Sequence, residues 1–536
     1  MMIEGENMIK DVGSVKKETS KTNKSAKSAI IIVIFGLASK FLGFVRETLI
    51  AAKFGSGMET DTFFIALAAT SLVTAFISNA IATTFIPVLS EIESKEGKRG
   101  KIDHTNNMMN VVFVITAILV ALGYFIAPLT IRLLARGFEG AQFDLAVSLT
   151  RMGLPMILFS GLIGILTGYL QSEQRFTSSS AVGIPYNFLY IFFLLFLSSI
   201  FGIKGLMVAG VVAVISKLLI QVPEARSAGY SYSFKFDLKD TYVQKVLLLS
   251  VPVLVGVAID DLNAIVDKTL ASDLAAGSIS SLNYANKLNG LMLGVFIGAI
   301  TTVIFPLLSK ESNDNNIAGM KKIMAKGIDL ILIITVPATV GLVVLSTPII
   351  QVAFERGEFD ALATDMTSPA LKFYSVGLVA MAMRLLLTRV YYSLQDTKTP
   401  MINGAIAVVF NIGFNLVLVR SMGHAGLALA TSIAATITSL LLLRGLRKKI
   451  GPLGIKVYTV TLLKTGLASI IMGFAAYLIY YGVYGLLGVS KIYNLLALLI
   501  AAGLGALIYG ILCYLMRVEA VRYVFNKAVN KIKNKE

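Results

Sequence analysis

Apolar stretches long enough to cross a lipid bilayer recur along almost the whole chain. Each one approaches or exceeds the ~20 residues that a helix needs to span the hydrocarbon core. Gly and Pro interrupt several of them, which membrane helices tolerate because their neighbours satisfy the freed backbone groups. The pattern predicts fourteen transmembrane helices, at residues 28–53, 62–90, 108–135, 145–170, 182–201, 204–223, 244–271, 279–308, 323–347, 364–393, 401–421, 424–445, 457–485 and 493–517.

The composition agrees with this pattern and excludes an ordinary soluble enzyme. Of 536 residues, 56% are hydrophobic and only 15% are charged, whereas a soluble domain carries roughly 25% charged residues. The sequence has a single cysteine, Cys513, which excludes a disulfide scaffold and a Cys-based metal site. Its two histidines lie far apart in sequence, which disfavours catalysis by histidine. We therefore expect an all-α integral membrane protein that is not an enzyme.

The net charge of +17 lies mainly in alternate loops. Lys and Arg gather in an N-terminal arm (1–27), a linker (226–243) and a C-terminal tail (518–536), whereas the intervening loop at 272–278 has no cation. Cytoplasmic loops of membrane proteins carry the excess of positive charge. Both termini are therefore predicted to be cytosolic, which requires an even number of spans, and no nucleic-acid partner is needed to explain the charge.

An internal repeat divides the predicted helices. The sequence FIPVLSE at 85–91 returns as IFPLLSK at 304–310, and ARG at 135–137 returns as ERG at 355–357. Both offsets, 219 and 220 residues, correspond to six helices, so the copies have the same orientation in the membrane. Such repeats form transporter lobes with a substrate site between them. The predicted architecture is two pseudo-symmetric six-helix lobes, 28–225 and 244–449, followed by two C-terminal helices within 450–517.

Several charged residues lie inside predicted spans, where they are costly and usually face a cavity or a partner. Lys40, Arg46 and Glu47 are in the first helix, Asp61 opens the second, and Lys287 is in the eighth. If these helices line the cavity between the lobes, the cations would suit a phosphate group, which arginine can bind in bidentate fashion. A structural interpretation stays open, in which Lys40 reaches the membrane surface and Arg46 pairs with Glu47.

A second group of polar side chains carries only oxygen and amide groups. Asn411 and Asn415 are one turn apart on the eleventh helix, Thr431 is on the twelfth, and Asp267 is on the seventh. Together they could offer carboxylate, amide and hydroxyl oxygens to Na⁺. The alternative is ordinary hydrogen bonding between helices. The last two helices, within 450–517, are either a lipid-facing pair or the walls of an apolar track.

Five segments resemble the MurJ/MviN family of lipid II flippases: SKFLGFVRE at 39–47, FGSG at 54–57, TDTFF at 60–64, FERGEF at 354–359 and YYSLQDTKTP at 391–400. The similarity extends from about residue 28 to residue 517. It implies the fold of the multidrug/oligosaccharidyl-lipid/polysaccharide exporter superfamily, with fourteen helices. It also implies that undecaprenyl-pyrophosphate-linked peptidoglycan precursor, lipid II, is moved from the inner to the outer leaflet of the bacterial cytoplasmic membrane by alternating access.

The resemblance also assigns roles to residues. Arg46 matches an arginine of the family's central cavity, with Glu47 in the acidic place beside it. Asp61 matches the family aspartate, and Lys40 and Lys287 stand where many members have arginine. Helices 13 and 14 would hold the lipid tail.

The implied partners are lipid II and membrane lipids, with cell-wall synthases as further candidates. No cofactor is expected, and Na⁺ or the membrane potential is the expected driving force. Two other functions stay open: a flippase for another undecaprenyl-linked glycan, such as a capsule or teichoic precursor, and a cation-coupled drug exporter of the same superfamily.

Overall fold

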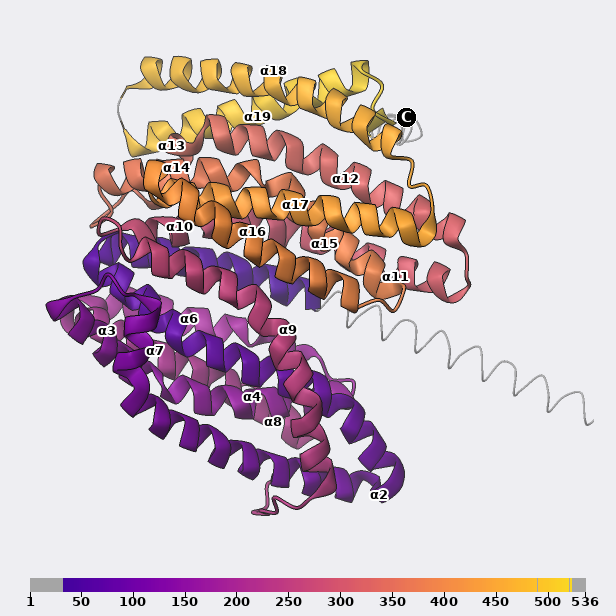
Figure 1. The fold of residues 1–536 in the computed structure, drawn as a ribbon. Coiled ribbons are helices and arrows are strands. Elements are labelled where there is room, and N and C mark those ends of the chain that lie inside the picture. The colour runs from indigo at the N-terminus through magenta and orange to yellow at the C-terminus, as the bar shows by residue number, and fades with distance from the viewer. Residues whose placement is uncertain (1–31, 489, 520, 523–536) are drawn as a thin grey trace, which may run out of the picture. The chain divides into compact units, whose positions relative to one another are not determined.

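The computed structural model describes residues 32–488, 490–519 and 521–522. Within those residues every regular element is helical (Figure 1), which confirms the predicted all-α class. The predicted basic arm, 1–27, lies outside the described residues, and so does most of the predicted tail, 518–536.

Helices occupy most of each predicted range, and residues 28–31 of the first range lie outside the described residues. A helix over residues 32–54 comes first. It is followed by α2 (Met58–Leu134), α3 (Gly140–Gly153), α4 (Pro155–Ser172), α5 (Thr177–Ala181), α6 (Gly183–Phe196), α7 (Ser198–Leu219), α8 (Gln221–Ser227) and α9 (Thr241–Ala271). The second half contains α10 (Ser278–Met292), a π-helical turn (Leu293–Ile297), α11 (Gly298–Asn313), α12 (Ile317–Val344), α13 (Ser346–Phe354), α14 (Ala361–Val376), α15 (Leu378–Ser393), α16 (Lys398–Met422), α17 (His424–Ile450), α18 (Ile455–Leu487) and α19 (Lys491–Leu515).

The chain is a multi-pass membrane protein. Among the described residues, ten helices are long and apolar enough to cross a bilayer, and an eleventh is added if α14 and α15, bent by 46°, form one span. The 77 residues of α2 contain a break at Gly97, whose φ of 70° is a conformation that glycine adopts readily. The predicted spans 62–90 and 108–135 lie on either side of this break. The exact number of fourteen spans stays a prediction.

The chain forms two compact units, each assembled from segments far apart in sequence. The first contains the described part of Met1–Arg46, with Thr70–Ile126 and Thr150–Leu254. The second contains Glu47–Ala69, Ala127–Leu149 and the described part of Val255–Glu536. The predicted lobe boundaries stay a prediction.

Each unit has its own hydrophobic core. In the first, buried side chains of α2, α4, α8 and α9 pack together, among them Leu89 and Leu166. In the second, the core is formed by α11, α12, α15 and α17 and includes Ile328 and Leu386.

The last two helices belong to the second unit. In Figure 1, α18 and α19 lie side by side, and α18 also packs along α12. Small buried residues such as Ala468 and Ala497 bring these helices close together, as is usual in membrane bundles. Large side chains such as Leu463 and Leu507 are exposed. This distribution is typical of helices that face lipid on one side.

Candidate functional site

Asp61 lies in the first turn of α2, and both of its carboxylate oxygens bind the start of α10. The Gly277 N–H donates to Oδ2 at 2.7 Å, and the N–H and hydroxyl of Ser280 each donate to Oδ1 at 2.7 Å. A carboxylate at a helix N-terminus satisfies N–H groups that lack a partner within the helix, and it interacts favourably with the helix dipole. Asp61 therefore anchors α10, and its direct contact with a substrate stays a prediction.

Residues just before Asp61 bind the same part of the second unit. The Ser56 hydroxyl donates to the Gly277 carbonyl oxygen at 3.1 Å and lies 2.8 Å from the Ser280 hydroxyl. The Tyr284 hydroxyl donates to the Gly55 carbonyl oxygen at 3.0 Å. These contacts show that the FGSG and TDTFF segments hold α10 in place.

Two predicted site residues, Glu47 and Lys287, lie together in the second unit. Lys287 Nζ is 3.4 Å from Glu47 Oε1, and the Asn283 side-chain amide donates to Glu47 Oε2 at 3.4 Å. The Glu47 side chain is 4% exposed and that of Lys287 is 45% exposed. Lys287 can thus offer its ammonium to an anion while Glu47 orients it. Asn283 was not predicted, although its position one turn before Lys287 places it on the same helix face.

The repeated glycine motif packs reciprocally in the second unit. A Cβ at Gly137 would lie 2.2 Å from the Ser272 carbonyl oxygen, and a Cβ at Gly357 would lie 2.1 Å from the Ala52 carbonyl oxygen. The Glu358 N–H donates to that same Ala52 oxygen at 2.9 Å. Ala52 and Ser272 are separated by the same 220 residues as the two glycines. Each copy of the motif therefore packs against the end of the other copy's first helix, so closely that only glycine fits.

A group of cations and tyrosines lies in the first unit. The Arg46 guanidinium carbon is 5.3 Å from the ring centroid of Tyr186 and 5.1 Å from that of Tyr190, and Lys217 Nζ is 3.9 Å from the Tyr186 centroid. Such cation–π contacts contribute about 0.5–2 kcal/mol each. Sequence reasoning missed Lys217, although a lysine inside a predicted span was an available signal. Lys40, on the same helix as Arg46, is exposed.

The five predicted substrate residues are divided between the units. Lys40 and Arg46 belong to the first unit, and Glu47, Asp61 and Lys287 belong to the second. Within the second unit the structure joins Glu47 to Lys287 and ties Asp61 to the helix that carries Lys287. A single cavity lined by all five stays a prediction.

The four residues of the predicted ion site lie together. Asn415 Nδ2 donates to Asp267 Oδ1 at 2.6 Å. The Thr431 hydroxyl lies 3.2 Å from Asp267 Oδ2 and 3.2 Å from the Asn411 amide group. The Asn411 amide group also lies 2.7 Å from Asn415 Nδ2 and 2.7 Å from Oδ1 of Asn263, which was not predicted. Asp267, Asn411 and Asn415 are buried, so helices α9, α16 and α17 share a polar cluster.

These features define a class of protein. The chain is an all-helical, multi-pass membrane protein with buried carboxylates at Glu47, Asp61 and Asp267, an arrangement typical of transporters.

Comparison with known proteins identifies the family. Residues 50–498 match the family described as "Lipid II flippase MurJ". A "Probable lipid II flippase MurJ" of Vibrio cholerae is 32% identical over 441 residues, which are 80% of this chain and 84% of that protein. A "Lipid II flippase MurJ" of Burkholderia cenocepacia is 29% identical over 425 residues, 77% of this chain and 82% of that protein. The chain belongs to the lipid II flippase MurJ family.

Solved structures support the same conclusion. A "Lipid II flippase MurJ, inward closed conformation" superimposes with a TM-score of 0.77 at 29% identity, covering 92% of this chain and 100% of that one. An inward-facing multidrug resistance transporter of the MATE family has a TM-score of 0.65 at 13% identity, covering 79% of this chain and 98% of that one. At that identity the second likeness shows a shared fold alone.

Proposed function

We propose that this protein moves lipid II from the inner to the outer leaflet of the bacterial cytoplasmic membrane, and so supplies peptidoglycan synthesis. The Glu47–Lys287 pair carries the proposal, because it presents a half-exposed ammonium on a helix that Asp61 anchors. An ammonium of this kind binds phosphate, and lipid II carries a pyrophosphate. The relatives are named as lipid II flippases, so transport of another undecaprenyl-linked glycan or of drugs has less support.

The proposed mechanism makes and breaks no covalent bond. Lys287 and Arg46 hold the pyrophosphate, and Lys40 adds positive charge at the exposed part of the first helix. Glu47 orients Lys287 and Asp61 keeps α10 in position. The two repeat copies then rock against each other, so that the cavity opens to one side of the membrane at a time. Cell-wall synthases stay predicted partners that receive the product.

The test is leaflet-resolved measurement of lipid II in cells depleted of the protein and complemented with variants. We expect Arg46→Ala and Lys287→Ala to lower outward transfer strongly, and Lys287→Arg to retain it because the charge is kept. Lys491→Ala is the matched control, since Lys491 is an exposed lysine at the start of α19. Normal outward transfer after depletion, in a cell without a second flippase, would overturn the proposal.

An apolar cavity supports the proposed role of α18 and α19 in holding the lipid tail. It has a volume of about 500 Å³ and lies between α12, α13, α18 and α19, with Pro337, Met472 and Gly505 among its lining residues. A leucine at Gly505 would fill this cavity, whereas a leucine at Gly503 would enter open space. We expect Gly505→Leu to slow transfer of full-length lipid II more than of a short-tailed analogue. Equal effects of Gly505→Leu and Gly503→Leu would contradict a tail groove.

The cluster around Asp267 is the proposed Na⁺ site. Asn415 Oδ1 is buried and has no hydrogen-bond partner among the described residues, which leaves an oxygen available to a cation. Hard cations prefer carboxylate, carbonyl and hydroxyl oxygens, and Asp267, Asn411, Asn415 and Thr431 supply these types. Bound Na⁺ would add a positive charge that balances Asp267 and links α9 to α16 and α17.

Ligand-linked stability tests the Na⁺ site without any transport measurement. A ligand that binds only the folded protein raises its unfolding temperature with concentration. We expect NaCl to raise the unfolding temperature of the purified protein more than choline chloride does at equal ionic strength. Asp267→Asn should abolish the difference between the two salts. An equal response of the wild-type protein to both salts would count against a Na⁺ site.

We also propose fourteen spans in two parallel six-helix lobes, with both termini cytosolic. The reciprocal packing of Gly137 on Ser272 and of Gly357 on Ala52 supports the two-fold relation between the copies. Thiol labelling in a Cys513→Ser background tests the orientation. A Gly451→Cys variant should react from the cytosolic side and a Gly488→Cys variant from the outside, because these residues follow α17 and α18 at opposite ends of α18. Labelling of both cysteine variants from the same side of the membrane would refute the proposed orientation.

A further inference from the structure

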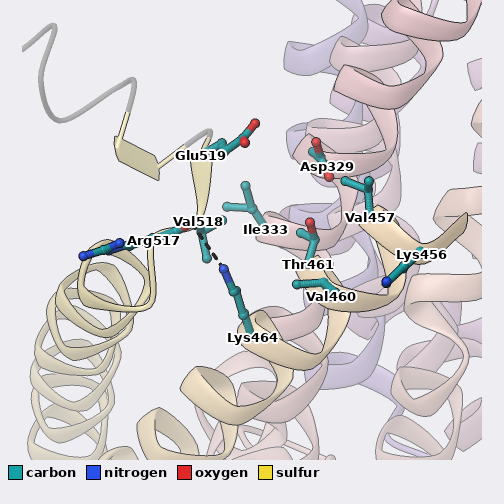
Figure 2. Close-up of a pocket in the computed structure, with 10 residues that line it drawn as sticks. All are labelled: Asp329, Ile333, Lys456, Val457, Val460, Thr461, Lys464, Arg517, Val518 and Glu519. Atoms are coloured by element: carbon teal, nitrogen blue, oxygen red, sulfur yellow. Dashed lines mark hydrogen bonds between the residues drawn. The ribbon is translucent and has the colours of Figure 1, made fainter. Parts of the chain in front are cut away.

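A polar cavity of about 280 Å³ lies where α18 begins, between α12, α18 and the residues that follow α19. Five charged residues line it: Lys456 and Lys464 from α18, Asp329 from α12, and Arg517 and Glu519 from the residues that follow α19. Figure 2 shows the two carboxylates on one side of the cavity and the two ammonium groups on the other. The Arg517 guanidinium points away from the other charged groups. The cavity is therefore bipolar, with separate acidic and basic sides.

The charged groups of this cavity have spare binding capacity. Within the part of the chain that the structure describes, Asp329 Oδ1 is buried and has no hydrogen-bond partner. Lys464 Nζ makes a single long hydrogen bond, 3.4 Å, to the Arg517 carbonyl oxygen. Among the described residues, no ion pair joins either carboxylate to either lysine. A buried carboxylate oxygen without a donor is costly, so the acidic side of the cavity is suited to a ligand that supplies N–H groups.

The polar cavity adjoins an apolar one on the same helices. Ile333 of α12 lines both the 280 Å³ cavity and the apolar cavity of about 500 Å³ between α12, α18 and α19. Beside them, α18 exposes large apolar side chains such as Val457 and Leu463, typical of a lipid-facing surface. A charged compartment next to an apolar one matches the head and the chains of an amphipathic molecule.

We propose that the polar cavity binds the headgroup of a phospholipid that carries both a phosphate and a primary ammonium, as phosphatidylethanolamine does. Lys456 and Lys464 bind the phosphate, in the way that basic pockets between membrane helices bind lipid headgroups. Asp329 and Glu519 bind the ammonium, whose N–H groups give Asp329 Oδ1 the donor that it lacks. The acyl chains leave the cavity past Ile333 and lie along the exposed apolar surface of α18, where Val457 and Leu463 are found.

The carboxylates make this site selective among membrane lipids. A trimethylammonium group, as in phosphatidylcholine, has no N–H to donate to Asp329. The headgroup of phosphatidylglycerol has no cation, and it would place a phosphate near two uncompensated carboxylates. The lipid preference is thus a property of the Asp329–Glu519 side of the cavity and does not depend on the transport activity proposed above.

Native mass spectrometry of the full-length purified protein tests the proposal, with phosphatidylethanolamine, phosphatidylcholine or phosphatidylglycerol added at equal concentration. We expect phosphatidylethanolamine to bind about tenfold or more tightly than the other two, because phosphatidylcholine has no N–H group for Asp329 and phosphatidylglycerol has no cation to balance the two carboxylates. Glycerophosphoethanolamine, which has no acyl chains, separates the contribution of the headgroup from that of the chains. It should compete weakly with the intact lipid, and failure to compete at any concentration would place the binding energy outside the polar cavity.

Charge variants then assign the two sides of the cavity. The double variant Lys456→Gln/Lys464→Gln should weaken binding of phosphatidylethanolamine and phosphatidylglycerol alike. The double variant Asp329→Asn/Glu519→Gln should remove the preference for phosphatidylethanolamine over phosphatidylglycerol. Unfolding temperatures show whether each variant is folded, and Lys491→Gln/Asp314→Asn, at exposed positions elsewhere, is the matched control.

Three further results would overturn the proposal. The first is equal binding of phosphatidylcholine and phosphatidylethanolamine by the wild-type protein. The second is a preference for phosphatidylglycerol that depends on the two lysines, which would indicate a site for anionic lipid. The third is an unchanged preference for phosphatidylethanolamine over phosphatidylglycerol in a folded Asp329→Asn/Glu519→Gln variant.

Discussion

Removing the Asp61 carboxylate should destabilise the protein by detaching the start of α10. Its two oxygens accept three hydrogen bonds of 2.7 Å, two of them from backbone N–H groups and one from the Ser280 hydroxyl. Asp61 is 3% exposed. Water therefore cannot readily replace the carboxylate in an Asp61→Ala variant, and both backbone donors would be left buried without a partner.

The magnitude follows from these contacts. A buried donor without a partner costs about 1–3 kcal/mol, and loss of a helix N-terminal cap costs about 0.5–2 kcal/mol. For Asp61→Ala we expect a loss of about 2–5 kcal/mol in the free energy of unfolding, taking the two backbone donors as the main part. Asp61→Asn keeps one oxygen for Ser280 but turns an NH₂ group towards the Gly277 N–H, so we expect a loss of about 1–3 kcal/mol.

Reversible unfolding in mixed detergent micelles measures these differences, and leaflet-resolved lipid II transfer is measured on the same variants. Glu59→Ala is the matched control, because Glu59 is an exposed carboxylate in the same first turn of α2. It should change stability by less than about 0.5 kcal/mol. If Asp61→Ala is as stable as the wild type but transfers no lipid II, the anchoring role is wrong and Asp61 acts on the substrate.

Two further predictions concern the repeated motif and the loop after α15. Gly357→Ala should lower the unfolding temperature sharply, because its Cβ would lie 2.1 Å from a carbonyl oxygen and its φ is +59°. Gly341→Ala is the control and should leave the unfolding temperature unchanged, because Gly341 has open space around it. Equal effects of the two substitutions in a thermal unfolding assay would refute the close packing of Gly357. Burial opposes ionisation of Asp396, but hydrogen bonds from Lys449, at 2.7 Å, and from Thr399 hold the pKa of Asp396 at about 2, below its usual 3.8. A carboxyl group with a lowered pKa stabilises the folded state above the unfolded pKa, and this contribution is lost as pH falls from about 4 towards 2. Lys449→Gln should therefore reduce the loss of stability across that pH range, and an unchanged pH profile of unfolding would contradict the role of the ion pair.

Much of the fold could be predicted from the sequence because a bilayer restricts what a chain can do. Backbone groups in hydrocarbon must bond within their own segment, so long apolar stretches become helices. The repeat was visible for a related reason: Gly137 and Gly357 each meet a backbone carbonyl so closely that no other residue fits. The polar residues of the ion cluster could also be selected from the sequence, since few such groups lie inside apolar spans.

The partners of each polar group depended on packing between helices that are far apart in the chain. Arg46 and Glu47 are neighbours in sequence, yet Arg46 lies over Tyr186 and Tyr190 in the first unit while Glu47 binds Lys287 in the second. Asp61 was predicted as a site residue, and only the structure shows that it caps α10.

The sequence alone determined the apolar helices, the repeat and the presence of charged residues inside apolar spans, because hydrophobic periodicity and residue type are local properties. The tertiary structure decided which charges meet, where α10 is anchored, and which cavities lie beside α18. Those features arise from contacts across more than a hundred residues of chain, for which the local pattern contains no information.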